Sequence, residues 1–160
     1  MEFLIYFLTA VLAYIGLAGG FALAQISPEE MKPGRKYFDA LNYILFSLIM
    51  LMLLFFESPT IGITVLLAIS IYIKFGRQKA TLKIAYGVLG AVLALLTFDK
   101  YIFMITASLI FMFGIVSGTL CSIRHSQMSR KQQFLYIMGS NALFFLTALP
   151  LYFLELKVIP

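Results

Sequence analysis

Long apolar stretches alternate with short polar connections along the whole chain. Each stretch approaches the ~20 residues that an α-helix needs to cross a bilayer, within a usual range of about 17–25. The pattern therefore predicts one all-α domain over residues 1–160, a polytopic integral membrane bundle of six transmembrane helices. We expect these helices at about 3–26, 37–56, 58–75, 82–98, 101–123 and 134–154.

The third and fourth stretches are shorter than the others. They can span a bilayer if Lys74 and Lys83 extend their ammonium groups to the membrane surface. A re-entrant hairpin is the alternative for this pair. We favour two spans, because only then do the charged residues divide consistently between the two sides of the membrane.

Basic residues fall almost entirely in alternate connections. Cytoplasmic loops of membrane proteins carry such an excess of Lys and Arg. The asymmetry predicts three basic cytoplasmic loops and both termini outside, most simply in a prokaryotic plasma membrane. Lys100 and Lys157 lie in the outer connections. The other ten of the twelve Lys and Arg residues are Lys32, Arg35, Lys36, Lys74, Arg77, Lys79, Lys83, Arg124, Arg130 and Lys131.

Local signals also mark helix boundaries. The segment Ser27–Glu30 has a capping-box pattern with Pro at the first helical position, which predicts a short interfacial helix that Pro33–Gly34 ends. Asp99 can cap the helix at 101–123. A cleaved signal peptide is the alternative for 3–26, but Glu2 replaces the usual basic residue and the apolar stretch is too long.

Composition narrows the class of protein. The chain is 62% hydrophobic and only 12% charged, which excludes a cytosolic enzyme, a secreted domain and a disordered tail. One Cys and one His exclude an internal disulfide, a cysteine zinc site and a histidine-rich metal cluster, and we expect no cofactor. The net charge of +5 fits anionic lipid headgroups better than nucleic acid, because the basic residues separate apolar stretches.

Two glycine pairs have the spacing of close helix contacts. Gly16 and Gly20 form one pair, and Gly114 and Gly118 form the other. Small residues four positions apart let helix backbones approach closely in lipid. One interpretation is packing within the bundle. The other is a face for a homo-oligomer or a partner membrane protein.

A few polar residues fall inside the apolar stretches and form a candidate cavity. Asp39, Asn42 and Tyr43 share one helix face, and Ser140 and Asn141 could oppose them from the last helix. Hydrogen bonding between helices is the alternative role for these side chains. Asp39 lies near the cytoplasmic boundary, so the sequence does not favour a proton- or sodium-coupled pump.

The fifth stretch ends in a basic segment with the only histidine. Arg124, His125, Arg130 and Lys131 could bind a phosphate or a lipid headgroup. A simple positive-inside loop is the alternative.

Three classes of function remain open. The first is a non-catalytic accessory or scaffold subunit that packs against another membrane protein. The second is a small facilitator of a neutral or hydrophobic solute near Asn42 and Asn141. The third is an interfacial lipid-modifying enzyme that uses His125 or Asp39. Complete signatures of intramembrane proteases, phosphotransferases and quinone-reactive cysteines are absent, so the sequence leans away from an enzyme.

Overall fold

The computed structural model describes residues 2–56 and 79–158 of the chain. Every regular element within these residues is helical, which confirms the all-α fold for them. The elements in chain order are α1 (Phe3–Ile26), α2 (Pro28–Phe56), α4 (Lys79–Leu95), the 3₁₀ turn η1 (Leu96–Phe98), α5 (Lys100–Arg124), α6 (Arg130–Ser140) and α7 (Leu143–Val158).

Within residues 2–56 and 79–158, four helical segments are long and apolar enough to cross a membrane, which indicates an integral membrane protein. A shorter apolar stretch at Lys83–Phe98 accompanies them. The expected span at 58–75 lies outside the described residues, so six spans stay a prediction. The four segments are Phe3–Ile26, Pro33–Leu54, Lys100–Arg124 and Arg130–Leu154.

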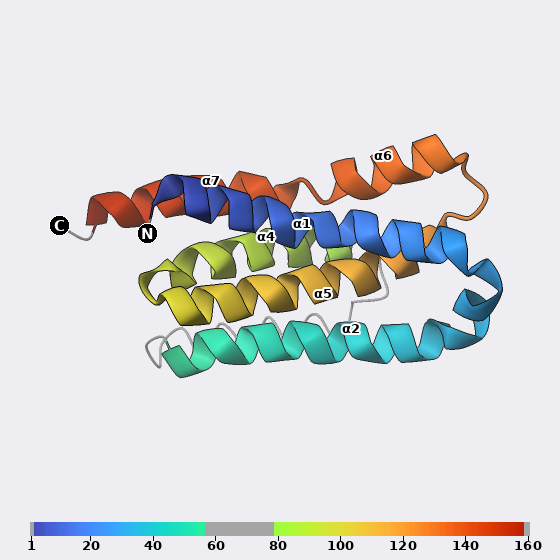
Figure 1. Ribbon diagram of the computed structural model, residues 1–160, viewed down its shortest axis with the longest axis horizontal. Helices are drawn as coiled ribbons and strands as arrows, with labels where there is room; N and C mark the ends of the chain where they lie inside the picture. Colours follow the sequence, from blue (N-terminus) through green and yellow to red (C-terminus); the bar gives the residue numbers. More distant parts are fainter. Residues whose placement is uncertain (1, 57–78, 159–160) are drawn as a thin grey trace.

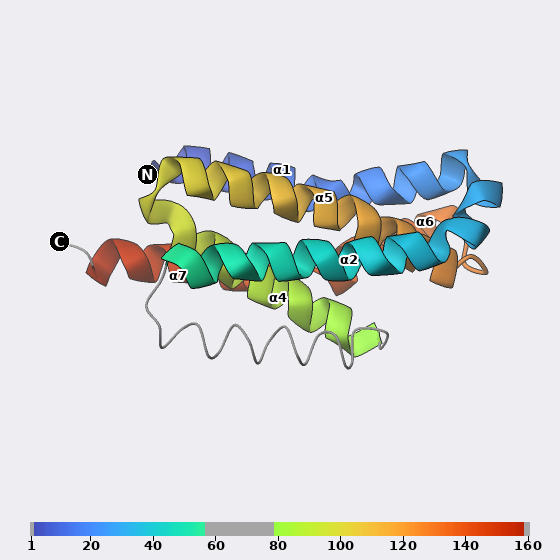
Figure 2. The ribbon, with the colours of Figure 1, turned by 90° about the horizontal axis from the view of Figure 1, so that it is seen from below.

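The helices run along one long axis, and both termini lie at the same end of the bundle (Figure 1). We call this the terminal end, and α5 begins there at Lys100. The opposite, loop end holds the connections at 26–28 and 125–129. The most extensive contacts join α1 with α5, α4 with α7, and α2 with α5 (Figures 1 and 2).

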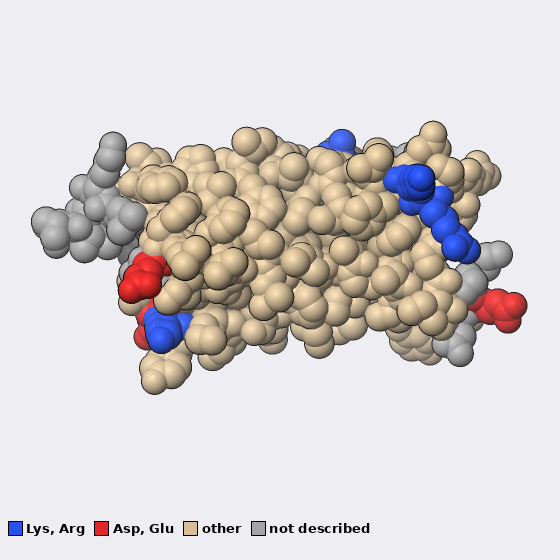
Figure 3. Space-filling view, turned by 45° about the horizontal axis from the view of Figure 1, so that its top comes forward, with Lys and Arg blue, Asp and Glu red and all other residues tan. Residues whose placement is uncertain are grey.

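Charged side chains gather at the two ends of the bundle. On the face shown in Figure 3, most Lys and Arg atoms lie towards the loop end, and the surface between the ends is almost uncharged. Basic and acidic atoms lie together at the terminal end, and a further acidic group protrudes at the loop end. The apolar middle of this face is the part that suits the hydrocarbon core of a membrane.

The two glycine pairs face each other in the contact between α1 and α5. A Cβ at Gly16 would collide with the carbonyl oxygen of Phe111, and a Cβ at Gly114 would lie 3.0 Å from the carbonyl carbon of Gly16. A Cβ added at Gly20 or at Gly118 would also collide with a backbone carbonyl oxygen of the opposite helix. The glycine faces are therefore occupied within the chain, and van der Waals contact between the two backbones stabilises the pair.

A similar close contact joins α4 to α7. Gly90 leaves no room for a Cβ beside the carbonyl oxygen of Phe144. One turn away, the hydroxyl of Thr147 donates a hydrogen bond of 2.7 Å to the carbonyl oxygen of Gly87. Small residues and a hydroxyl thus hold this second helix pair together.

The expected helix end at Pro33–Gly34 is wrong, because α2 runs without interruption from Pro28 to Phe56. Proline lacks the N–H that would bond to a carbonyl four residues earlier. The first four N–H groups of any helix lack such partners, and Pro33 comes only just after them. The proline therefore costs the helix one bond near its end and does not stop it.

The expected cap at the start of α5 is confirmed. The Oδ1 atom of Asp99 accepts hydrogen bonds from the backbone N–H groups of Tyr101 at 2.8 Å and Ile102 at 3.2 Å. These bonds satisfy two N–H groups that the helix itself leaves unpaired.

The single helix expected at 134–154 is two helices in the structure. α6 begins earlier, at Arg130, and ends at Ser140, and α7 begins at Leu143. The interruption falls in the middle of the candidate span Arg130–Leu154. Asn141 is the C-cap of α6, and an asparagine side chain can compete for the backbone groups that would otherwise continue a helix.

Candidate functional site

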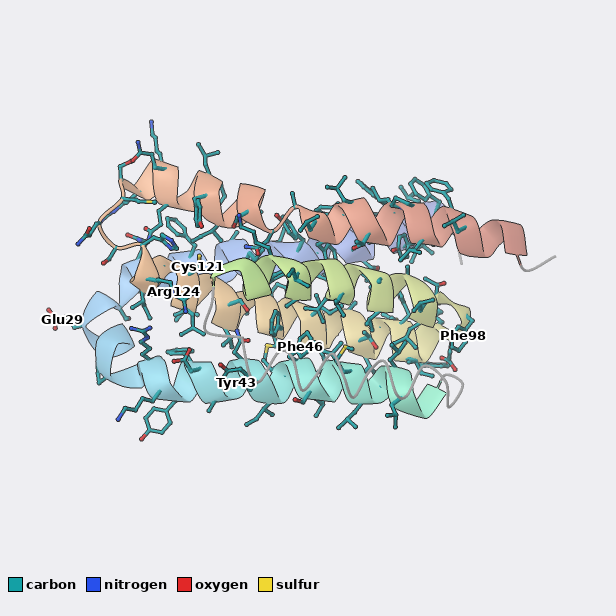
Figure 4. All side chains as sticks on the ribbon, turned by 180° about the vertical axis from the view of Figure 1, so that it is seen from behind. Glu29, Tyr43, Phe46, Phe98, Cys121 and Arg124 are labelled. Atoms are coloured by element: carbon teal, nitrogen blue, oxygen red, sulfur yellow. The ribbon has the colours of Figure 1, made fainter. Side chains whose placement is uncertain are left out.

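Asn42 is the polar residue of the expected site that joins α2 to a neighbouring helix. Its side chain is buried, and Nδ2 donates a hydrogen bond of 2.8 Å to Oγ of Ser117 on α5. Asp39 and Tyr43 are only half-buried. One turn further along α2, Phe46 extends towards α5 (Figure 4), where its ring centroid lies 6.1 Å from that of Phe113. Asn42 therefore belongs to the contact between α2 and α5.

The structure does not bring the two halves of the expected cavity together. α2 carries Asp39, Asn42 and Tyr43 on one side of the bundle, and α6 and α7 lie on the other side, with α1, α4 and α5 between them (Figure 1). Ser140 and Asn141 thus lie apart from the polar residues of α2, at the interruption between α6 and α7.

At this interruption, the side chain of Asn141 donates a hydrogen bond to the backbone, as a helical N–H group otherwise would. Its Nδ2 donates to the carbonyl oxygen of Ile137 at 2.8 Å, and lies 3.3 Å from Oγ of Ser140. The residue is fully buried, and its Oδ1 has no hydrogen-bond partner in the described structure. A buried acceptor without a donor costs about 1–3 kcal/mol, so this atom is an exception that needs a reason.

Aromatic side chains fill the space around the interruption. The hydroxyl of Tyr14 on α1 donates a hydrogen bond to the carbonyl oxygen of Met138. The ring of Tyr14 lies 5.8 Å from Phe144 and 4.8 Å from Phe145, measured between centroids. Irregular backbone at membrane depth is tolerated where protein buries it. Here α1 covers the side of the interruption that holds Asn141, whereas Gly139 and Ala142 are exposed.

A second polar cluster lies at the loop end, and sequence analysis missed it. Nε2 of Gln133 on α6 donates to the carbonyl oxygen and to Oγ of Ser122 on α5, at 2.6 and 3.0 Å. Its Oε1 accepts from Nε2 of Gln25 on α1 at 3.1 Å. The sequence predicts a helix only from 134, which leaves Gln133 in a loop. Its place as the fourth residue of α6 is what brings three helices together.

His125 lies beside this cluster, immediately after α5. Its side chain is only 7% exposed, and Nδ1 lies 3.0 Å from the carbonyl oxygen of Cys121. The imidazole ring is 4.7 Å from the ring of Tyr136 on α6, between centroids. Nε2 is buried and has no hydrogen-bond partner in the part of the chain that the structure describes.

The other three basic-segment residues surround the same connection. Arg124 is half-buried in the last turn of α5, where a positive charge interacts favourably with the helix dipole. Figure 4 shows it near Cys121, at the loop end. Arg130 and Lys131 are exposed at the start of α6. The expected candidate site thus contains one buried imidazole, the half-buried Arg124 before it in the chain, and the exposed Arg130 and Lys131 after it.

An apolar groove of about 360 Å³ lies between α1 and α5, nearer the terminal end. Both helices contribute small and flexible side chains to it. None of the sequence patterns indicated this groove, because it depends on how the two helices diverge from their glycine contact. Its lining residues are Thr9, Leu12, Ala13, Met104, Ala107, Ser108, Phe111 and Met112.

Among the described residues, no three His, Cys, Asp or Glu side chains gather as a metal site would require. Comparisons with known proteins found no match to a family model, to a curated protein or to a solved structure. The features of the described structure that bear on function are therefore the groove, the interruption at Asn141 and the basic segment.

Proposed function

We propose that this chain is a non-catalytic membrane module that packs against a transmembrane helix of another protein. The apolar groove between α1 and α5 carries the proposal. It lies between two segments long and apolar enough to span a membrane, so lipid or another helix is what it meets.

The groove has a buried floor and an exposed apolar rim. Ala13 and Ala107 are almost fully buried, whereas Leu12, Met104 and Met112 are each more than half exposed. Small residues at the base allow close approach, and methionine side chains adapt to an irregular partner surface. This arrangement suits a side chain that enters from a neighbouring helix.

The hydroxyl groups of the groove are already bonded to their own helices. Oγ1 of Thr9 donates to the carbonyl oxygen of Ile5 at 2.8 Å, and Oγ of Ser108 donates to that of Met104 at 2.9 Å. The groove therefore offers shape and apolar contact, and it lacks the convergent polar groups that usually fix a small substrate.

The partner face differs from the one that the glycine spacing suggested. Gly16, Gly20, Gly114 and Gly118 are covered by the contact between α1 and α5. A partner helix must therefore dock on the exposed surface of α1 and α5, where the groove opens.

Cysteine cross-linking in native membranes tests the proposal. The only native cysteine, Cys121, is buried, so Ser108→Cys adds one accessible thiol at the groove. We expect Ser108→Cys to give a discrete adduct with a second polypeptide. Leu146→Cys is the matched control, because Leu146 is 67% exposed on α7, away from the groove. Adducts that are the same for both variants would contradict the proposal.

The interruption between α6 and α7 favours a second candidate function, a facilitator for a small neutral solute. Discontinuous helices form the solute sites of many transporters, near the middle of the membrane. Asn141 lies at such an interruption with an unpartnered, fully buried Oδ1. A solute hydroxyl could donate to this oxygen if Tyr14 and its aromatic neighbours move apart.

Vesicle swelling separates this candidate from the first. Reconstituted protein should raise the permeability to glycerol, and Asn141→Leu should abolish the increase. Asn42→Leu is the matched control, because Asn42 bonds to Ser117 and lies on the other side of the bundle. Equal glycerol permeability of vesicles with and without the protein would eliminate the facilitator.

A further inference from the structure

One ring nitrogen of His125 lies within hydrogen-bonding distance of a backbone carbonyl, and the other has no partner in the described structure. Nδ1 lies 3.0 Å from the carbonyl oxygen of Cys121 and 3.6 Å from Sγ of the same residue. A protonated Nδ1 donates to this carbonyl oxygen, because a carbonyl can only accept. Nε2 is then a bare acceptor in the neutral ring and a donor in the imidazolium. In the described structure it meets neither a donor nor an acceptor.

Nε2 of His125 is buried from solvent, and buried polar atoms in proteins normally have hydrogen-bond partners. His125 is 7% exposed, and native structures leave few buried polar atoms unsatisfied. Packing alone does not account for it, because the neighbouring polar side chains Gln25, Ser122 and Gln133 bond to one another. A ligand that binds at Nε2 would supply this hydrogen bond.

The surroundings of His125 are cationic. Arg124, Arg130 and Lys131 lie within six positions of it along the chain. No described carboxylate forms an ion pair with any of these three residues. At the loop end, Figure 3 shows a large group of Lys and Arg atoms and a smaller acidic group apart from it. The missing partner of Nε2 is therefore expected to be an anion.

The position along the helix indicates where this anion comes from. His125 follows the last residue of the 25-residue candidate span Lys100–Arg124. The end of a span lies at the membrane surface, where basic pockets between helices bind lipid headgroups.

We propose that His125 and the adjacent basic residues bind an anionic phosphate group, which a membrane lipid or a free phosphate compound can supply. The Nε2–H group of the imidazolium donates to a phosphate oxygen, while Arg130 and Lys131 provide charge at the entrance. The half-buried ring of Tyr136 turns aside to admit the phosphate. This site is independent of the groove and of the interruption at Asn141.

Lipid retention in native mass spectrometry tests the site. The full chain is reconstituted into nanodiscs of phosphatidylcholine with a minor fraction of phosphatidic acid, and the protein is then released gently. We expect wild type to retain phosphatidic acid preferentially. His125→Phe should weaken this retention about tenfold or more, the effect of losing one hydrogen bond to a charged group.

Two further variants keep the result interpretable. His125→Gln retains a side-chain N–H donor and should preserve part of the preference if the fold of His125→Phe is damaged. Lys36→Gln removes an exposed positive charge from α2 and is the matched control for Arg130→Gln. We expect loss of retention in Arg130→Gln and none in Lys36→Gln.

A second arm distinguishes the sources of phosphate. Calorimetry with inorganic phosphate, in nanodiscs of phosphatidylcholine alone, asks whether the free ion binds in a His125-dependent way. Binding there assigns the site to soluble phosphate compounds, and retention of phosphatidic acid alone assigns it to lipid. Two results would overturn the proposal: equal lipid retention and phosphate binding by wild type and His125→Phe, or an equal loss in Lys36→Gln.

Discussion

The hydroxyl of Tyr14 on α1 donates to the carbonyl oxygen of Met138, 124 positions later in the chain. In an uninterrupted helix this carbonyl would accept from the N–H of Ala142. That N–H instead lies 3.4 Å from the carbonyl oxygen of Gly139, because α6 ends at Ser140. A side chain of the first helix thus supports the backbone at the point where the last span is interrupted.

Removing this hydroxyl should destabilise the bundle. Tyr14→Phe is expected to lower the free energy of unfolding by about 0.6–1.7 kcal/mol, between the average and the largest values for hydrogen bonds between membrane helices. Denaturant unfolding in mixed micelles measures the change. Tyr37→Phe is the control, because Tyr37 is 80% exposed and should tolerate the same change. Equal stability of both variants would mean that the Tyr14 bond contributes nothing.

Adding one methyl group to the contact between α1 and α5 should have a larger effect. Gly16→Ala places a Cβ against the backbone of Phe111, and such overpacking typically costs about 1–3 kcal/mol. Thermal unfolding of the detergent-solubilised protein measures the loss.

Gly139→Ala is the matched control for this change. Apart from its chain neighbours and the backbone of its own helix, no atom lies within 4 Å of the position that a Cβ would occupy at Gly139. Alanine also has a better helix propensity than glycine, by about 1 kcal/mol. We expect unchanged or increased stability, and a loss equal to that of Gly16→Ala would contradict the packing argument.

Asn42 and Ser117 should be energetically coupled. A double-mutant cycle of Asn42→Leu and Ser117→Ala is expected to give a coupling free energy of about 0.6 kcal/mol, the average for such bonds in membrane proteins. The measurement is the unfolding free energy of wild type, both single variants and the double variant. Strict additivity would show that this bond is not made in the membrane.

The cap of α5 should protect the first turn of that helix. Asp99→Ala removes an acceptor from the N–H groups of Tyr101 and Ile102 and should cost about 1 kcal/mol. Hydrogen exchange at these two amides is expected to become faster. Asp99→Asn keeps a side-chain oxygen and should retain most of the protection; if it exchanges as fast as Asp99→Ala, charge rather than capping is responsible.

Hydropathy and capping predict the spans well where one pattern dominates. The bounds expected for the first helix, 3–26, are those of α1, and Asp99 caps α5 as its position indicates. The start of α6 was missed because its first residues are polar, as loop residues are. Their helical state depends on Ser129 as N-cap and on the bonds of Gln133 to Ser122.

The sequence patterns do not predict which side chains contact one another in the folded bundle. The spacing of Gly16 and Gly20 indicates a close helix contact but does not identify the helix on the other side. Likewise, nothing in a hydropathy profile shows that the amide of Asn141 bonds to Ile137, or that Asn42 lies away from it across the bundle. These relationships depend on where α6 ends and on how the helices pack in three dimensions.

The pairing of α1 with α5 also sets an order of events during biosynthesis. Thr119 bonds to the carbonyl oxygen of Gly20, which lies 99 positions earlier. At roughly 5–20 residues per second, a ribosome needs on the order of ten seconds to make the chain between them. Throughout that interval α1 has entered the membrane without the helix that covers its glycines. The nascent chain must therefore keep this face sheltered, by lipid or by the insertion machinery, until α5 arrives.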